Sequence, residues 1–259
     1  MLIFLILFFV IGIFFGSFLT VLIDRIPRKE SIFGRSYCET CKSVLTWKDL
    51  IPLISFASLF AKCRYCKAPL SYYYPMVEIV TGLIFSATFY SVWTQHQETF
   101  LPSLIFYLLI SSSLIIIFFS DLKHGVIPDK ILFPTLLLTV LYIFSFETRS
   151  FYLNLLSGTG AFLFFLVIFL ITRGKGMGFG DVKFSALMGF LLGFPETVAA
   201  VYSAFLTGGI SAIILVLWRK KRFGRKDTIP FGPFLVLGAF LSLFFGDLII
   251  KYSARLLGI

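Results

Sequence analysis

Long hydrophobic runs alternate with short polar stretches along most of this chain. Each run contains almost no charge, as expected of a segment that lies in lipid. Backbone groups in lipid must form their hydrogen bonds within the segment, which favours α-helices. We therefore predict a bundle of about eight transmembrane helices. They are expected at about 2–23, 76–93, 102–120, 131–146, 151–172, 182–194, 197–218 and 231–250.

Three of these runs are unusual in length or position. Those at 131–146 and 182–194 are short for a hydrocarbon core of about 30 Å. We expect flanking residues to lengthen them, or the helices to lie partly inside the bundle. The first run follows Met1 without a basic leader or a small-residue cleavage site. It is therefore expected to be a retained helix and not a secretory signal.

The composition supports the same fold class. Hydrophobic residues make up 58% of the chain and charged residues 14%, with a mean hydropathy of +0.96. A water-soluble domain could not bury so much apolar surface. We predict an all-α polytopic membrane protein in three parts, which are a first transmembrane helix at 1–23, a cysteine-containing loop at 24–75 and a transmembrane core at 76–259.

The net charge of +10 predicts an orientation and not a nucleic-acid partner. The basic residues lie between hydrophobic runs and lack interleaved base-stacking aromatics. When the predicted helices cross the membrane in turn, all but three of the 23 Lys and Arg residues lie on the same side of it. The three exceptions are Arg149, Lys251 and Arg255. Because positively charged loops stay in the cytoplasm, both termini are expected outside it and the cysteine loop within it.

All four cysteines lie in this loop, as Cys38-x-x-Cys41 and Cys63-x-x-Cys66. Two such pairs at this separation are typical of a tetrathiolate zinc site. Two disulfides are the alternative, but they rarely persist in a reducing cytoplasm. Because four sulfurs leave no open coordination position, the predicted zinc is structural. Basic residues beside the pairs could face acidic lipid head groups, a substrate or solvent.

Two aspartates are expected at the same cytoplasmic membrane border. Asp121 ends the third predicted helix and Asp181 begins the sixth, within Gly178-Phe179-Gly180-Asp181. Ionisable groups at the membrane are costly and often functional. Two adjacent carboxylates would share a proton, so that one activates water while the other protonates a carbonyl oxygen. Helix capping is the alternative for each of them.

Four further residues are candidates for substrate binding or positioning. Gly178 and Gly180 would let the backbone approach a peptide closely beside Asp181. Lys183 would favour the charged form of Asp181, or only mark the cytoplasmic side. Glu78, just inside the second predicted helix, would orient another group or favour the start of that helix.

The order of several motifs resembles the prepilin peptidases, or type IV leader peptidases, which are GxGD aspartic membrane proteases. The similar segments follow one another along nearly the whole chain. They are Gly16-Ser17-Phe18, Arg25-Ile26-Pro27, the two cysteine pairs around 50–55, Tyr74 to Gly82, Asp121 with Ile127-Pro128-Asp129, Gly178 to Lys183, and Pro230 to Phe234. Thr20 and Asp24 depart from the family's pattern, where Asn and an aromatic residue are common.

The resemblance implies that Asp121 and Asp181 are the catalytic pair. It implies cleavage, after a glycine, of the basic leader of type IV prepilins or of pilin-like secretion and competence precursors at the inner membrane. Many members then methylate the new N-terminus with S-adenosylmethionine, an activity associated with the cysteine loop. The chain has no glycine-rich nucleotide fingerprint that would support a donor site by itself.

Two other functions use the same features. A proton-coupled transporter would use the acids as a relay, but transport sites usually lie near the bilayer midplane between repeats. The aspartates are expected at one face, and the helices show no internal repeat. A membrane scaffold with a zinc-binding loop would leave both aspartate motifs without a role. The sequence does not predict the oligomeric state.

Overall fold

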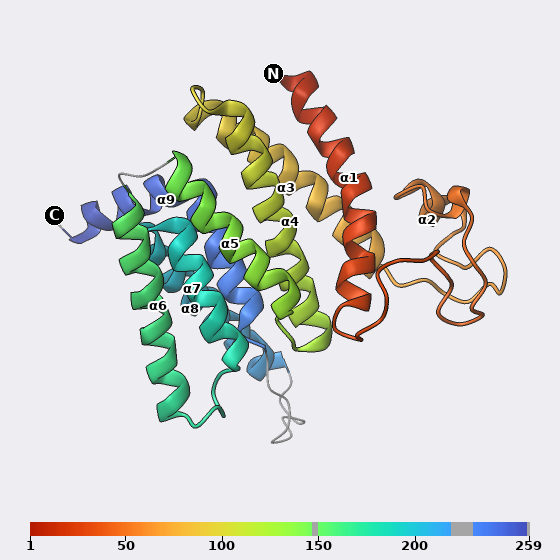
Figure 1. Ribbon diagram of the computed structural model, residues 1–259. Helices are drawn as coiled ribbons and strands as arrows, with labels where there is room; N and C mark the ends of the chain where they lie inside the picture. Colours follow the sequence, from red (N-terminus) through yellow and green to blue (C-terminus); the bar gives the residue numbers. More distant parts are fainter. Residues whose placement is uncertain (147–149, 219–229, 258–259) are drawn as a thin grey trace. The chain divides into compact units, whose positions relative to one another are not determined.

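The computed structural model describes residues 1–146, 150–218 and 230–257, and within these ranges the regular secondary structure is helical apart from two isolated β-bridges (Figure 1). Arg149 and the basic stretch from Arg219 to Lys226 lie outside the described residues. The helices are α1 (Leu2–Arg25), η1 (Trp47–Asp49), α2 (Ile54–Ser58), α3 (Tyr73–Gln95), α4 (Phe100–His124), α5 (Asp129–Phe146), α6 (Phe151–Ile171), α7 (Phe179–Leu192), α8 (Glu196–Trp218) and α9 (Gly232–Leu257).

The predicted all-helical membrane fold is confirmed. Each of the eight predicted segments coincides with one long helix, α1 or α3 to α9, to within a few residues at most ends. Among the described residues, six helices are long and apolar enough to cross a membrane, namely α1, α3, α4, α5, α6 and α8. Helix α7 has only 14 residues, and the apolar part of α9 spans Gly232–Gly246.

The chain divides into two compact units, residues 1–119 and 120–259. In the first, α1 and α3 cross at very close range because glycines face each other. A Cβ on Gly12 would lie 2.7 Å from the Cα of Gly82, and one on Gly16 would lie 2.8 Å from the Cα of Glu78. Small residues at such crossings allow backbone packing in lipid, where no hydrophobic effect drives helices together.

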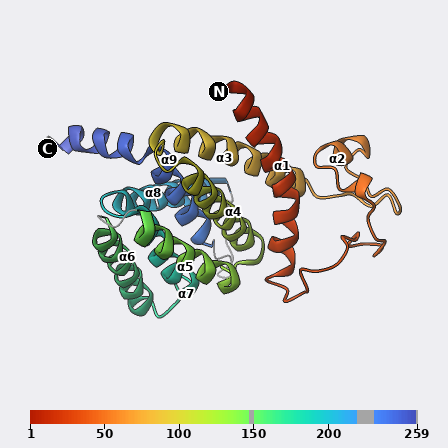
Figure 2. The same cartoon turned by 45° about the horizontal axis from the view of Figure 1, so that its top comes forward.

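In the second unit, the short helix α7 packs against α5, α6, α8 and α9. It lies beside α6 in both ribbon views (Figures 1 and 2). A Cβ on Gly189 would lie 2.7 Å from the Cα of Gly158, and the Asn154 amide donates a hydrogen bond of 3.0 Å to the Phe190 carbonyl. Because its neighbours surround it, α7 does not need the length of a lipid-facing helix.

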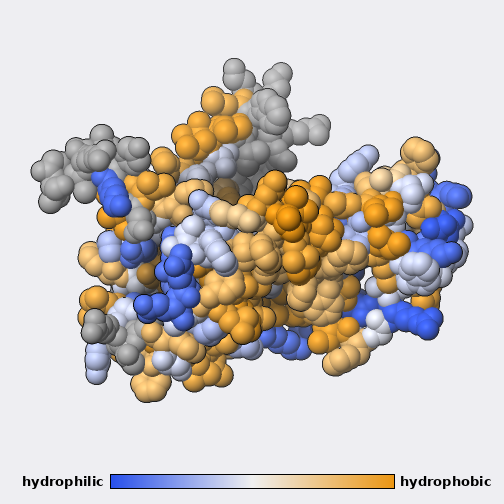
Figure 3. Space-filling view, turned by 90° about the horizontal axis from the view of Figure 1, so that it is seen from above, coloured by the Kyte–Doolittle hydropathy of each residue, from blue (hydrophilic) through white to orange (hydrophobic). Residues whose placement is uncertain are grey.

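The surface reflects this division between lipid-facing helices and a polar loop. Large hydrophobic side chains are widely exposed on the helices, among them Ile3 and Ile171. The space-filling view shows hydrophobic surface over much of the helical part, with hydrophilic residues at the cysteine loop and in further patches on the helical part (Figure 3). An exposed apolar surface of this extent is expected where lipid is the solvent.

Candidate active site and metal centre

Asp121 lies in the last turn of α4 and is only 5% exposed. Helix α4 ends at once beyond it. The Gly125 amide donates to the Asp121 carbonyl over 2.9 Å, and Gly125 adopts a positive φ of 65°. This left-handed conformation suits glycine and turns the chain out of the helix. The Ser120 hydroxyl donates to the Val126 carbonyl and holds the turn against α4.

Asp181 lies in the first turn of α7 and is 6% exposed. Its side chain closes a hydrogen-bonded cap, because its Oδ2 accepts the Gly178 amide at 3.1 Å while its own amide donates to the Gly178 carbonyl. The capping expected as an alternative for Asp181 is therefore present. This cap uses Oδ2 of Asp181 and does not involve Oδ1.

The two carboxylates meet beside the start of α9. A Cβ built on Gly232 would lie 3.2 Å from Asp181 Oδ1, 3.1 Å from Asp121 Cγ, and closer still to Asp121 Oδ2. Because an oxygen of each carboxylate lies against the same Cβ position, the two carboxylates are close neighbours. Asp121 Oδ2 is buried and has no hydrogen-bond partner among the described residues. Two carboxylates this close in a buried site disfavour ionisation of both members at once.

The segments that follow the two aspartates are tied to each other. The Lys183 ammonium, in α7, forms an ion pair with Asp129 in the first turn of α5. A Cβ on Gly180 would lie 3.2 Å from the Cβ of Ile127, so this glycine allows the two segments to touch. The Lys183 charge is thus paired with Asp129. Asp129 therefore connects α5 to α7 as well as lying in the first turn of α5.

Gly232 is a site residue that the sequence reasoning missed. In the sequence it belongs only to the Pro230 to Phe234 segment. Its signal was a glycine at a predicted helix start, in a segment that resembles a family motif, but nothing in the sequence alone places it between two distant aspartates.

The four cysteine sulfurs form one cluster in the first unit. All lie within 4.8 Å of one another and all are free thiols, with Cys38 and Cys66 sulfurs 3.9 Å apart. In a tetrahedral site with zinc–sulfur bonds of about 2.3 Å, sulfurs are separated by about 3.8 Å. The donor set and its spacing therefore fit a single structural zinc ion.

The two cysteine pairs are held by the same local backbone structure. The Lys42 amide donates to the Cys38 carbonyl, and the Lys67 amide donates to the Cys63 carbonyl. Both lysines have positive φ, 57° and 59°, and a β-bridge closes each turn. Each pair is thus a compact knuckle that presents two sulfurs inward.

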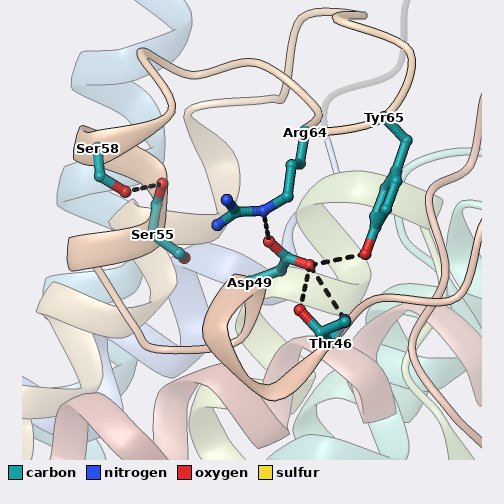
Figure 4. A network of polar contacts seen from close by, with 6 residues as sticks. All are labelled: Thr46, Asp49, Ser55, Ser58, Arg64 and Tyr65. Atoms are coloured by element: carbon teal, nitrogen blue, oxygen red, sulfur yellow. Dashed lines mark hydrogen bonds and ion pairs between the residues drawn. The ribbon is translucent and has the colours of Figure 1, made fainter.

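A polar network connects the segment between the knuckles to the second one (Figure 4). The Asp49 carboxylate accepts hydrogen bonds from Arg64, Tyr65 and Thr46. Burial raises the pKa of Asp49, but the bonds from Arg64 and Thr46 outweigh burial and lower it to about 2. Because this is below the unfolded value of about 3.9, the network stabilises the loop above about pH 4 and is lost as pH falls through about 2.

Glu78 and Arg25 fasten the cysteine loop to the α1 and α3 helices. The buried Glu78 carboxylate accepts the Leu53 amide at 2.9 Å. The buried Arg25 guanidinium donates to the carbonyls of Ser31 and Arg35 at 3.1 Å each. The two side chains thus tie the loop backbone to the helices that carry them.

Comparison with known proteins agrees with the motif order. The bacterial peptidase A24 N-terminal domain matches residues 10–92, and the type IV leader peptidase family matches residues 108–213. The chain is 33% identical over 249 residues to the prepilin leader peptidase/N-methyltransferase of Bacillus subtilis, covering 96% of this chain and 97% of that protein. The chain belongs to the type IV leader peptidase family.

Other leader peptidases are similar over the same extent. The prepilin leader peptidase/N-methyltransferase of Legionella pneumophila is 30% identical, with 95% of this chain and 94% of that protein covered. That of Pseudomonas aeruginosa is 26% identical, with 96% and 92% covered. No solved structure matches the chain. The family match covers both the cysteine loop and the aspartate motifs, so this leader peptidase is a multi-pass membrane protease with both elements.

Proposed function

We propose that this leader peptidase cleaves the basic leader from type IV prepilins or pilin-like precursors by aspartic catalysis at Asp121 and Asp181. The observation that carries the proposal is the meeting of these two buried carboxylates beside Gly232. Two carboxylates at such range in a poorly solvated site cannot both ionise. The pair therefore holds one acid and one base together, as peptide hydrolysis by water requires.

In this mechanism the ionised carboxylate takes a proton from water, which attacks the scissile carbonyl carbon. The protonated carboxylate donates to the carbonyl oxygen as negative charge develops there. When the tetrahedral intermediate collapses, the leaving nitrogen is protonated from the pair. Gly178 orients Asp181 through its amide. The Lys183–Asp129 ion pair and the Gly180–Ile127 contact hold the two aspartate segments together.

The orientation predicted from the basic residues supports a position of this site at the cytoplasmic border. A prepilin has a cationic leader in the cytoplasm and an apolar stem in the membrane, so its scissile bond lies at the same border. The leader is attracted by the aspartates, and the stem packs on apolar helix surface. Both termini of the peptidase then lie outside the cytoplasm, and lipid covers the exposed apolar helices.

The cysteine cluster would hold a zinc ion through Cys38, Cys41, Cys63 and Cys66. A zinc ion there would crosslink the two knuckles and so stabilise the loop. With four sulfur ligands it has no open position for water, so no catalytic step involves it.

We further propose N-methylation of the new N-terminus, supported by the names of the full-length relatives. S-adenosylmethionine would supply the methyl group. Mass spectrometry of the mature N-terminus tests this second activity, since methylation adds the mass of one methyl group.

Cleavage of a prepilin in membranes by Asp121→Asn and Asp181→Asn tests the peptidase proposal. Each variant is expected to lose at least about 10³-fold in rate, because the pair works as a unit. Asp129→Asn is the matched control, since Asp129 lies near the site but is 53% exposed at its side chain, and it should lose less than about tenfold in rate. Persistent cleavage by either of the first two variants would refute the mechanism.

A further inference from the structure

Gly232 lies where a side chain would separate the two aspartates. A Cβ at this position would lie 3.2 Å from Asp181 Oδ1 and closer than any ordinary contact to Asp121 Oδ2. Gly232, Asp121 and Asp181 are all buried, and the atoms closest to this Cβ belong to the two carboxylates, so a side chain at 232 must displace a carboxylate. Gly232 does not have a positive φ, so the obstacle to a larger residue is space and not backbone conformation.

The backbone of Gly232 also interacts with Asp121. Gly232 is the first residue of α9, and its amide interacts with the Asp121 carboxylate. The next residue, Pro233, has no N–H to donate. The first turn of α9 therefore directs the Gly232 amide at a buried carboxylate whose Oδ2 has no hydrogen-bond partner in the described part of the chain. Helix N-termini favour negative charge in this position.

We propose that Gly232 is a positioning residue of the peptidase, whose missing side chain lets both carboxylates close on the start of α9 and whose amide orients Asp121. The proposal rests on the proposed function of the aspartate pair. Gly232 does not take part in proton transfer. It sets the distance and direction of the groups that do.

Gly232→Ala tests the space requirement, with Gly209→Ala as the matched control. Gly209 lies in α8 with no atom within 4 Å of a built Cβ, so it accepts alanine. Alanine favours helix formation over glycine at both positions, so a loss at 232 cannot come from a weaker helix. We expect kcat for prepilin cleavage to fall at least about 100-fold in Gly232→Ala, because displacement of catalytic groups by about 1 Å has effects of this size.

The Michaelis constant separates positioning from a general structural defect. In Gly232→Ala, KM should stay within about twofold of wild type, because the apolar substrate stem still binds and only the transition state loses its groups. Gly209→Ala should match wild type in both constants. A Gly232→Ala enzyme with more than a tenth of the wild-type kcat, or a Gly209→Ala enzyme with the same loss, would overturn the proposal.

A measurement on the unaltered Gly232 covers the case in which Gly232→Ala does not fold. In protein labelled with ¹⁵N-glycine, the Gly232 amide signal, assigned by additional labelling of the preceding phenylalanine and by Phe231→Leu, should move in Asp121→Asn and stay in Asp129→Asn. A Gly232 signal that does not move in Asp121→Asn would overturn the proposal.

The aspartate variants also distinguish a failure of the proposed function from a failure of the proposed role of Gly232. If they still cleave, the proposed function fails. If they are inactive while Gly232→Ala is fully active, only the role of Gly232 fails.

Discussion

At the aspartate site, the residues around each carboxylate find their partners in the other aspartate segment. Lys183 pairs with Asp129, and Gly180 packs on Ile127. The sequence predicts Asp121, Asp181 and their neighbours as candidates, because ionisable groups at the membrane are costly and often functional. It does not predict the pairings, since each depends on α5, or the turn before it, packing against α7. Gly232 escaped the prediction because its position beside the aspartates likewise depends on how distant segments pack.

The ion pair between Lys183 and Asp129 leads to a prediction about single residues. Its side chains are 23% and 53% exposed, so it is expected to contribute less than about 1 kcal/mol to stability. Lys183→Met and Asp129→Asn should lower prepilin cleavage to a similar, modest extent, by less than about tenfold. The charge-swapped double variant Lys183→Asp/Asp129→Lys should recover part of the loss. A much larger loss in Lys183→Met than in Asp129→Asn would show that Lys183 acts on Asp181 directly.

At the scale of elements, the hydrophobic pattern was a good guide to the helices. All eight predicted segments are helical, because lipid leaves a chain of this composition few other ways to pair its backbone groups. The pattern is less informative for α7. Its 14 residues are enclosed by four other helices, and burial by neighbours cannot be read from a single apolar run.

The cysteine loop also shows what spacing can and cannot predict. Two C-x-x-C pairs predict one cluster, and the four sulfurs do lie together. The attachments of the loop to its helices, through Arg25 and Glu78, have no sequence signal beyond the burial of a charge. The network of Asp49 with Arg64 is likewise set by the folded loop.

Metal removal provides a prediction for this element. The purified protein should contain one zinc ion per chain by metal analysis, and a strong chelator should make residues 31–70 sensitive to proteolysis. Prepilin cleavage should fall by less than about tenfold on zinc removal, because a closed four-sulfur site activates no water. Cys38→Ser should reproduce both effects. If removal of zinc instead abolishes cleavage as completely as Asp121→Asn does, the metal has a catalytic role.

For the whole molecule, the two units correspond broadly to two family regions. The N-terminal domain match at 10–92 falls within the first unit, and the leader peptidase match at 108–213 falls largely within the second. The four cysteines lie in the first and both aspartates in the second. The family resemblance predicts that the cysteine pairs precede the aspartate motifs along the chain. The proposed metal binding and the proposed hydrolysis therefore belong to different units.

The distribution of basic residues predicts the orientation of the whole chain. Alkaline phosphatase fused after Ile259 should be active, because the C-terminus is expected outside the cytoplasm. The same reporter fused after Lys67 or Gly125 should be inactive. The opposite pattern would place the aspartates on the wrong side of the membrane for a cytoplasmic leader.

The central claim is that Asp121 and Asp181 act as one catalytic pair, and the double variant Asp121→Asn/Asp181→Asn tests it most directly. Its rate of prepilin cleavage should be measured beside both single variants, with zinc content and thermal stability confirming that all three fold. The account predicts that the double variant is no slower than either single variant, because removal of one member already disables the pair. Losses that multiply in the double variant, or a single variant that retains more than about a tenth of the wild-type rate, would contradict it.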